Sequence, residues 1–169
     1  RQIPGVQGVV TTLYDSKPGD EWDAQAIAAM QKQVEAAGLR ILGIESVNIH
    51  DAIKVGTPER DRYIENYIRT IEKLGRAGVP MICYNFMPVF DWTRSDLAKL
   101  RPDGSTVMAY DQREIDKIDP ARMFEQMESR ANGFVLPGWE PERMARIKDL
   151  FTLYQGVTEE KLFENLCYF

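Results

Sequence analysis

The sequence contains few of the residues that most often carry metal-ion or nucleophilic chemistry. Its 169 residues include one histidine and two cysteines, and the cysteines, Cys83 and Cys167, lie far apart without framework spacing. There is no histidine and cysteine cluster at metal-ligand spacing, no glycine-rich phosphate loop, no GxSxG motif and no HExxH motif. These absences argue against a zinc module, a P-loop nucleotidase, an α/β-hydrolase and a zincin protease.

The sequence also lacks long apolar runs and clusters of positive charge. No apolar run approaches the roughly 20 residues that cross a bilayer, and the first residues do not form the apolar core of a signal peptide. The formal net charge is -5 and the pI is about 5.0. We therefore expect neither nucleic acid nor a membrane as a partner. Cys83 lies in an apolar segment and is most simply a small buried side chain, so we expect a reducing, cytoplasmic location.

What the sequence does contain is the composition and periodicity of a folded globule. Hydrophobic residues make up 44% and charged residues 28%, and 169 residues are enough for one domain with a sizeable core. Apolar and β-branched runs predict strands at 6–13, 39–46 and 79–86. Apolar residues at helical spacing predict helices over 23–37 and 57–77.

The second predicted helix has the clearest boundaries. Thr57 is a suitable N-cap, Pro58 suits the first helical position, and Glu59 favours the positive end of the helix dipole. Gly38 and Gly78 follow the last turns of the two helices, where glycine commonly ends a helix. The apolar face of the second helix is predicted to consist of Ile64, Tyr67, Ile68, Ile71 and Leu74.

The alternation of strand, helix, strand, helix and strand predicts an α/β fold of parallel βαβ units with right-handed crossovers. In such folds ligands bind beyond the carboxyl ends of the strands, where the connecting loops converge. The segments at these ends are TLYDS (12–16), ESVNIHD (45–51) and YNFMPVFDWTR (84–94). We therefore expect the functional residues in these three loops.

Regular periodicity weakens after the third predicted strand. RPDGST (101–106) predicts a turn, and helices are predicted over 119–128 and after Pro137. The stretch 97–140 is long for a connection, so we expect a loop and helical insertion that acts as a lid or binding element. A last helix is predicted to begin at the N-cap Thr158. Its predicted apolar face consists of Leu162, Phe163, Leu166 and Phe169.

His50, the single histidine, follows the second predicted strand. A lone histidine is weak evidence for a metal site, and a structural role is about as plausible as hydrogen bonding to a ligand. Glu45 and Ser46 end the same strand. Glu45 could act as a base or as the partner of a cation, and it could equally cap nearby backbone amides.

The loop after the third predicted strand is unusually aromatic and charged. Asn85 can donate and accept hydrogen bonds, which suits a hydroxylated substrate, although an amide there can also cap the loop. Arg94 presents a fork that matches a carboxylate, unless Asp91 neutralises it. Trp92 can exclude water from such a site or belong to the core. Weaker candidates of the same kind are Tyr14 and Tyr110.

Three segments are long and compositionally unusual: IESVNIHDAIKVGTPERDRYIENY (44–67), VPMICYNFMPVFDWTRSDL (79–97) and PDGSTVMAYDQ (102–112). They closely resemble the mannonate dehydratase family. The similarity extends from IPGVQGVVTTLYD (3–15) to LFENLCYF (162–169) and includes LPGW (136–139).

The resemblance implies a (β/α)₈ TIM barrel of the xylose-isomerase-like group, of which residues 1–169 are the amino-terminal portion. Enzymes of the family remove water from D-mannonate to give 2-keto-3-deoxy-D-gluconate in hexuronate breakdown, with a divalent metal, Mn²⁺ or alternatively Fe²⁺. The metal stabilises the enediolate-like charge that develops when the proton α to the carboxylate is removed. The family's metal ligands lie in later strands, so the resemblance assigns none to this chain.

The resemblance also assigns a substrate-facing rim to this chain: His50, Asn85, Trp92, Arg94 and Tyr110. We expect a cytoplasmic, homo-oligomeric hydro-lyase that acts on a small sugar acid. The alternatives are a sugar isomerase or epimerase of the same superfamily and, for this chain alone, a non-catalytic partial barrel. The start at Arg1 and the apolar end of the last helix predict a longer polypeptide, without which we expect no activity.

Overall fold

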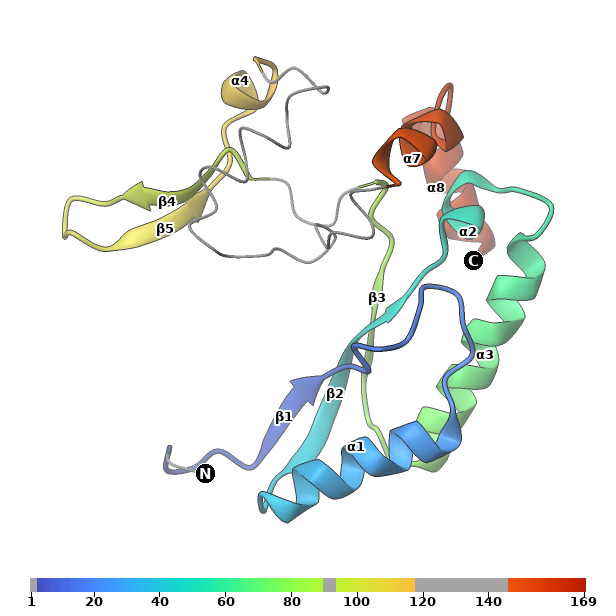
Figure 1. Ribbon diagram of the computed structural model, residues 1–169, viewed down its shortest axis with the longest axis vertical. Coiled ribbons are helices and arrows are strands. Elements are labelled where there is room, and N and C mark those ends of the chain that lie inside the picture. Colours follow the sequence, from blue (N-terminus) through green and yellow to red (C-terminus); the bar gives the residue numbers. More distant parts are fainter. Residues whose placement is uncertain (1–2, 90–93, 118–145) are drawn as a thin grey trace. The chain divides into compact units, whose positions relative to one another are not determined.

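The computed structural model describes residues 3–89, 94–117 and 146–169 (Figure 1). Contacts within the chain divide it into two compact units. The first comprises residues 1–88 and 153–169, and the second comprises residues 89–152. The predicted strands and the two long predicted helices all belong to the first unit.

Three parallel strands form the sheet of the first unit. They are β1 (Gly8–Thr11), β2 (Arg40–Asn48) and β3 (Ile82–Asn85), hydrogen-bonded in that order. The register places Asn48 beside Asn85 at the carboxyl ends of β2 and β3. The predicted parallel pairing is confirmed, although β1 and β3 are shorter than the predicted segments.

Helix α1 (Ala24–Ala36) confirms the first predicted helix, and the residues before it show why it begins there. The carboxylate of the N-cap Asp23 accepts a 3.2 Å hydrogen bond from the backbone N–H of Gln25. Trp22 precedes the cap and Ile27 lies in the second turn, and both are buried in the core. This pair is a hydrophobic staple, which fixes the angle at which the chain enters the helix. The sequence pattern does not predict a core position for Trp22.

The region between β2 and the second long helix differs from the prediction. Helix α3 (Arg60–Arg76) begins after Thr57 and Pro58 rather than at them, and its N-cap Glu59 makes no side-chain capping bond. The Thr57 hydroxyl is buried and has no hydrogen-bond partner among the described residues. The predicted N-cap and first-turn roles of Thr57 and Pro58 are therefore wrong. A short helix that was not predicted, α2 (Asp51–Val55), precedes them.

The physical reason is that the backbone N–H of Thr57 closes α2, while only its carbonyl takes part in the start of α3, by accepting a 3.0 Å hydrogen bond from Arg60 N–H. The backbone N–H groups of Gly56 and Thr57 both donate 3.0 Å hydrogen bonds to the carbonyl of Ala52. Gly56 has a φ of +78°, the left-handed conformation that commonly ends a helix. The backbone of Thr57 is thus already engaged by the preceding helix.

The core lies between the sheet and the two long helices (Figure 1). Its buried side chains come from α1, β2 and α3 and include Ile27, Met30, Ile41, Ile44, Val47, Tyr67 and Leu74. Neighbouring residues of a strand point to opposite faces of the sheet. Next to the buried Ile41, Leu42 is 37% exposed, and Val10 of β1 is 48% exposed. The second face of the sheet therefore carries exposed apolar side chains at these two positions.

The predicted apolar face of α3 is confirmed only in part. Leu74 and Tyr67 are buried, and Ile64 is partly buried against the core. Ile68 and Ile71, by contrast, are 50% and 39% exposed. The apolar surface of α3 is thus wider than the part that this sheet covers.

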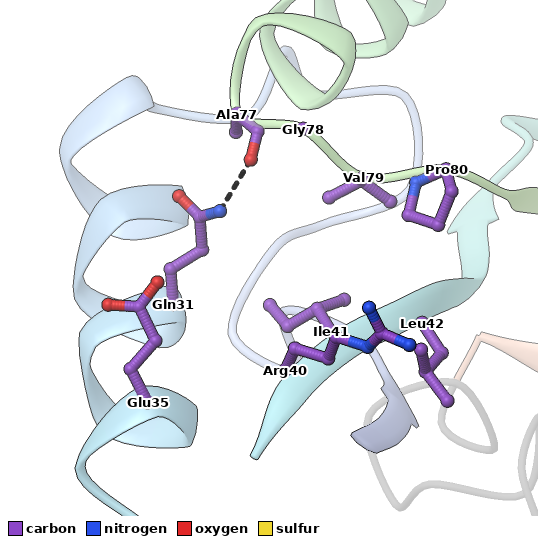
Figure 2. Close-up of a pocket in the computed structure, with 9 residues that line it drawn as sticks. All are labelled: Gln31, Glu35, Arg40, Ile41, Leu42, Ala77, Gly78, Val79 and Pro80. Carbon is purple, nitrogen blue, oxygen red and sulfur yellow. Dashed lines mark hydrogen bonds between the residues drawn. The ribbon is translucent and has the colours of Figure 1, made fainter. Parts of the chain in front are cut away.

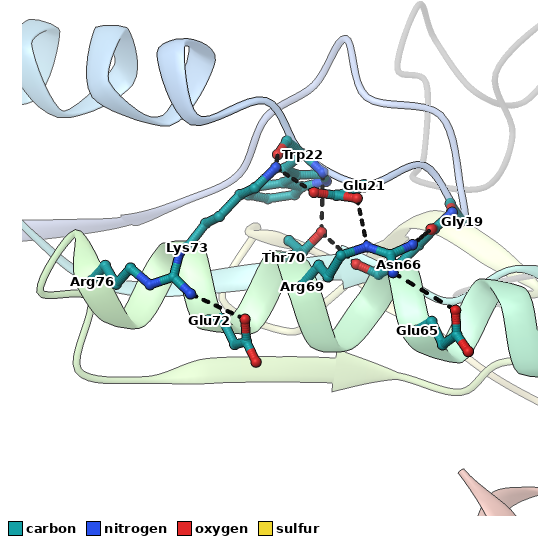
Figure 3. A network of polar contacts seen from close by, with 10 residues as sticks. All are labelled: Gly19, Glu21, Trp22, Glu65, Asn66, Arg69, Thr70, Glu72, Lys73 and Arg76. Atoms are coloured by element: carbon teal, nitrogen blue, oxygen red, sulfur yellow. Dashed lines mark hydrogen bonds and ion pairs between the residues drawn. The ribbon is translucent and has the colours of Figure 1, made fainter.

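A polar network fastens the loop before α1 to α3 (Figure 3). The carboxylate of Glu21 contacts Lys73 Nζ at 2.5 Å and Arg69 Nε at 2.7 Å. The backbone N–H of Trp22 donates to Thr70 Oγ1 at 3.0 Å, and the Trp22 carbonyl accepts from Lys73 Nζ at 2.8 Å. Hydrogen bonds from Lys73, and then from Arg69, hold the pKa of Glu21 below its usual value. The network therefore fixes this loop in place. The candidate site described below depends on the first residues of the same loop.

Helix α8 (Glu159–Tyr168) confirms the last predicted helix, including its N-cap. The Thr158 hydroxyl accepts a 3.2 Å hydrogen bond from the backbone N–H of Lys161. Phe169 packs edge-on against Tyr67 with ring centroids 4.9 Å apart. The predicted apolar face is wrong at Phe163, which is exposed, whereas Asn165 is 2% exposed. The helix is therefore held partly by a polar residue.

The second unit contains a β-hairpin. Strands β4 (Asp96–Leu100) and β5 (Thr106–Ala109) pair antiparallel around the predicted turn, where Asp103 Oδ1 accepts from Ser105 N–H at 3.0 Å. Helices α4 (Gln112–Ile115) and α7 (Ile147–Leu153) follow. The hairpin was not predicted, and the helices predicted over 119–128 and after 137 lie outside the described residues. No helix in the described part of the chain is long and apolar enough to cross a membrane.

The Glu21 network predicts a pH-dependent stability. Because its folded pKa is lowered, Glu21 stabilises the fold above its ordinary pKa of 4.5, and this contribution is lost as the pH falls through the lower folded value. We expect Glu21→Gln to lower the thermal midpoint at pH 7, and the difference from the wild type to vanish in acid. Glu72→Gln is the control, since the exposed Glu72–Arg76 pair contributes little. Equal midpoints for wild type and Glu21→Gln at pH 7 would contradict this account.

Candidate functional site

Polar side chains gather where the three parallel strands end. The hydroxyl of Thr12, just after β1, donates a 2.8 Å hydrogen bond to the carbonyl of Ser46 in β2. The Ser46 hydroxyl in turn donates to Asn48 Oδ1 at 3.3 Å, and Asn48 pairs in register with Asn85 of β3. Because ligands of parallel α/β sheets bind at this edge, we take it as the candidate site.

His50 lies two residues beyond the end of β2 and caps α2. Its Nδ1 accepts a 3.1 Å hydrogen bond from the backbone N–H of Ala52. The neutral ring therefore carries its proton on Nε2, which makes that atom a hydrogen-bond donor. The imidazole stacks on the ring of Tyr63, with centroids 3.7 Å apart and planes inclined by 12°. His50 thus has a structural role, and its ring orientation is fixed at the edge of the site.

Gly19 packs closely against the stacked pair. A Cβ at this position would lie 2.6 Å from Tyr63 Cδ1 and 2.8 Å from His50 Cβ, and the φ of Gly19 is +85°. The Gly19 carbonyl accepts a 2.9 Å hydrogen bond from Asn66 Nδ2 of α3. Only glycine fits here without a shift of the neighbouring side chains, so the loop after β1 helps to hold the His50 ring.

Asn85 brings an unsatisfied acceptor to the same edge. Its Oδ1 is buried and has no hydrogen-bond partner among the described residues. A buried acceptor without a partner costs about 1–3 kcal/mol, so the site favours a ligand that donates a hydrogen bond. A hydroxyl group is such a donor.

The other predicted site residues are not among those described at this edge. Arg94, which is half-buried, and Tyr110, whose hydroxyl donates to Gln112 Oε1, belong to the second unit. Trp92 lies outside the described residues. Tyr14 is highly exposed. His50 and Asn85 therefore share one strand-end edge, whereas a common site with Trp92, Arg94 and Tyr110 stays a prediction.

Sequence reasoning missed Thr12 and Asn48, and it did not assign Ser46 its bond to Thr12. The alternation of buried and exposed side chains along β2 could have indicated Asn48, because it follows the buried Val47 and is itself exposed. The pairing of Asn48 with Asn85 depends on the register between β2 and β3, which neither segment's sequence indicates by itself.

The described residues do not form a metal centre. Among them, no group of three or more His, Cys, Asp or Glu side chains is arranged to hold an ion. His50 Nδ1, a potential ligand atom, accepts the hydrogen bond from Ala52 instead. The hydroxyl and amide groups described at this edge suit hydroxyl recognition.

A cavity of about 540 Å³ lies at the opposite end of the sheet (Figure 2). It is lined by Arg40 at the start of β2, by Pro80 before β3, and by Gln31 and Glu35 of α1. Gln31 Nε2 donates a 2.5 Å hydrogen bond to the carbonyl of Ala77 at its border. Because this cavity lies at the amino ends of the strands, we do not assign it as the functional site.

The chain is similar to known proteins along its whole length. The sequence model of the D-mannonate dehydratase (UxuA) family matches residues 1–169. A mannonate dehydratase of Brachyspira hyodysenteriae is 68% identical over 169 residues, and one of Geobacillus thermodenitrificans is 57% identical over 169 residues. The crystal structure of mannonate dehydratase from Streptococcus suis serotype 2 matches 99% of the chain with 42% sequence identity and a TM-score of 0.79.

The chain spans about half the length of the curated relatives it matches. All of it aligns, but it covers 48% of the Brachyspira protein and 46% of the Geobacillus protein. It likewise covers 42% of the Streptococcus chain.

The packing around His50 predicts unequal costs for two glycine substitutions. Gly19→Ala and Gly156→Ala both place a side chain at a positive φ, +85° and +78°, but nothing lies within 4 Å of a Cβ at Gly156. We expect about 1–2 kcal/mol of destabilisation for Gly156→Ala from backbone strain, and about 1–3 kcal/mol more for Gly19→Ala from crowding. Urea unfolding of the full-length polypeptide measures both. Equal costs would show that Gly19 is not packed against the His50–Tyr63 pair.

Proposed function

Because this chain belongs to the D-mannonate dehydratase family, we propose that the full-length polypeptide containing it is a hydro-lyase. The reaction converts D-mannonate to 2-keto-3-deoxy-D-gluconate and water. The observation that carries this proposal is the match of the family over all 169 residues, together with 68% identity to a mannonate dehydratase over the same length. The strand-end edge with His50 and Asn85 is proposed to bind the polyhydroxy acid.

The fold of the full-length polypeptide is proposed to be a (β/α)₈ barrel. All-parallel sheets are usually buried on both faces, and here the helices cover only one. The second face carries the exposed apolar Val10 and Leu42, as the interior of a barrel requires. The strands β1 and β3 each have one edge without a partner strand in the described sheet. Relatives of twice this length have enough additional residues to pair both edges.

An apolar groove beside β3 supports the same proposal. It has a volume of about 520 Å³ and is lined by α3, β3 and Phe169, including Ile68, Ile71 and Tyr84. Burial raises the pKa of Tyr67 on its wall to about 12, so this phenol stays neutral. We propose that the following βα units of the full-length polypeptide fill the groove and pair with β3.

Dehydration of D-mannonate requires hydrogen-bonding partners for several hydroxyls. The proton on C2 is removed, the C3–O bond breaks, the leaving hydroxyl takes up a proton to depart as water, and the enol product becomes the keto acid. Asn85 Oδ1 is proposed to accept a hydrogen bond from a substrate hydroxyl. His50 Nε2–H is proposed to donate one to a substrate oxygen, since Nδ1 is engaged by Ala52. Together the two orient the acid relative to the groups that move the protons.

The remaining rim residues are proposed from the family resemblance. Arg94 would bind the substrate carboxylate through its guanidinium fork, because this geometry matches a carboxylate in bidentate fashion. Trp92 would exclude water, and Tyr110 would add a hydroxyl to the wall. All three follow β3 in the sequence.

Dehydratases of this family are metal-dependent, and we propose Mn²⁺, with Fe²⁺ as the alternative, for the full-length enzyme. Among the described residues no cluster is arranged to hold the ion, so we assign no ligand among them. The ligands are proposed to lie in the remainder of the polypeptide. Homo-oligomeric assembly and a cytoplasmic location stay predictions.

The substrate assignment is tested with the purified full-length polypeptide, its metal supplied. D-mannonate is compared with a panel of other aldonates and ketoses, and the product is identified by mass and NMR. We expect loss of water from D-mannonate and no isomerisation of ketoses. Interconversion of sugars without loss of water would instead identify an isomerase or epimerase.

Arg94→Ala is expected to reduce turnover in the full-length enzyme. Loss of a charge-assisted hydrogen bond of about 1.5–3 kcal/mol lowers kcat/KM about 10- to 100-fold, while the thermal midpoint is unchanged. Arg101→Ala, which removes an exposed arginine of the same unit, is the matched control. Unchanged kinetics for Arg94→Ala would reject its assignment.

The proposed barrel predicts that Ile68 is buried in the full-length polypeptide although it is 50% exposed in this chain. Ile68→Ala should then cost about 2–4 kcal/mol of unfolding free energy, as for a core isoleucine. Glu72→Ala, on the exposed side of the same helix, should change stability by less than about 0.5 kcal/mol. Urea unfolding compares the two. A small cost for Ile68→Ala would mean that the groove is not filled in this way.

A further inference from the structure

Helix α2 is too short to hold His50 in place by itself. It has five residues, Asp51–Val55, and isolated helices below about 12 residues are marginal in water. His50 is its N-cap, so the position of the imidazole follows the position of α2. The contacts that fix α2 from outside are therefore also contacts that fix the ring.

The carboxyl end of α2 is held by Asn165 of α8. Asn165 is 2% exposed, and its Nδ2 donates a 2.9 Å hydrogen bond to the carbonyl of Lys54, 111 residues earlier in the chain. The amide also packs on Gly56, where a Cβ would lie 2.6 Å from Asn165 Oδ1. The last carbonyls of a helix have no partner within it, so Asn165 satisfies a group that α2 cannot satisfy.

The amino end of α2 is held by Tyr154, which lies just before α8. The Tyr154 hydroxyl donates a 2.8 Å hydrogen bond to Asp51 Oδ1, and Asp51 directly follows His50. The same carboxylate oxygen lies 3.4 Å from Nζ of Lys54, a buried lysine. Residues 154–165 thus hold both ends of α2.

We infer that Asn165 and Tyr154 are positioning residues for His50: they place α2, and thereby the imidazole, at the substrate edge. The inference rests on the proposed function, in which His50 contacts D-mannonate. It extends that function to residues 154–165, from which no residue was assigned to the site. Tyr63 stacks on the ring, and Gly19 packs against Tyr63 and the Cβ of His50. Asn165 and Tyr154, by contrast, hold the backbone that carries the ring.

The test uses the full-length enzyme and two nearly isosteric variants, Asn165→Asp and Tyr154→Phe. A carboxylate cannot donate to the Lys54 carbonyl, and phenylalanine cannot donate to Asp51. Each variant is expected to lower kcat/KM on D-mannonate about 10-fold, because small displacements of a substrate-orienting group are costly. Glu164→Gln, an exposed residue of the same helix, is the matched control and should behave as the wild type.

A second readout separates positioning from general stability. The ¹⁵N NMR spectrum of the histidine-labelled enzyme, with the His50 signals assigned by loss in His50→Gln, reports whether Nδ1 accepts a hydrogen bond and Nε2 carries the proton. We expect both variants to shift the His50 signals while the other histidine signals stay in place. Wild-type His50 signals and wild-type kcat/KM in both variants, even with a lowered thermal midpoint, would overturn the inference.

The two variants and the His50 substitution distinguish a failure of the positioning inference from a failure of the proposed function. If Asn165→Asp does not fold, Tyr154→Phe decides, since it removes one hydroxyl. If His50→Gln has the kcat/KM of the wild type, the proposed contact of His50 with the substrate is wrong, and the spectra alone then decide whether Asn165 and Tyr154 position the ring. If His50→Gln is impaired and the spectra are unchanged, the positioning inference is wrong and the proposed function stands.

Discussion

The parallel pairing of β1, β2 and β3 is the constraint on which the rest of the first unit depends. Parallel neighbours cannot be joined by tight turns, so the chain crosses over through α1 and α3, and the core forms between these helices and the sheet. The same pairing brings the carboxyl ends of the strands to one edge, where Asn48 and Asn85 stand side by side. The parallel pairing of the strands thus produces both the core and the candidate site.

Helix α3 couples this core to the site. Its inner face buries Tyr67 and Leu74, and one side of it holds the loop before α1 through Thr70 and its neighbours. Near its start, Tyr63 stacks on His50. Stability and site geometry are therefore carried by the same helix, and its exposed isoleucines are the surface on which the proposed barrel would continue. A substitution in α3 that loosens the core would also be expected to loosen the imidazole.

Sequence patterns led to His50 and Asn85 because each follows an apolar run, and the end of such a run marks the end of a strand. The same kind of evidence failed at Thr57: threonine, proline and glutamate in succession have the pattern of a helix start at the threonine, but the N–H of Thr57 closes α2 and the N-cap of α3 is Glu59. No sequence pattern indicated that Asn165 is buried or that it holds another helix. A single asparagine on an amphipathic helix has the pattern of a surface residue, and its role depends on a carbonyl 111 residues away.

By itself the sequence determined the features that depend on near neighbours: the order of the three parallel strands and the two long helices, the N-cap Thr158, and the glycine stop at Gly38. These depend on interactions within about one helical turn or one strand, which the local residue types express directly. Only the tertiary structure decided that Trp22 and Asn165 are buried and how the ring of His50 is oriented. Those outcomes depend on contacts between segments far apart in the chain, and no local pattern records which distant partner a side chain will meet.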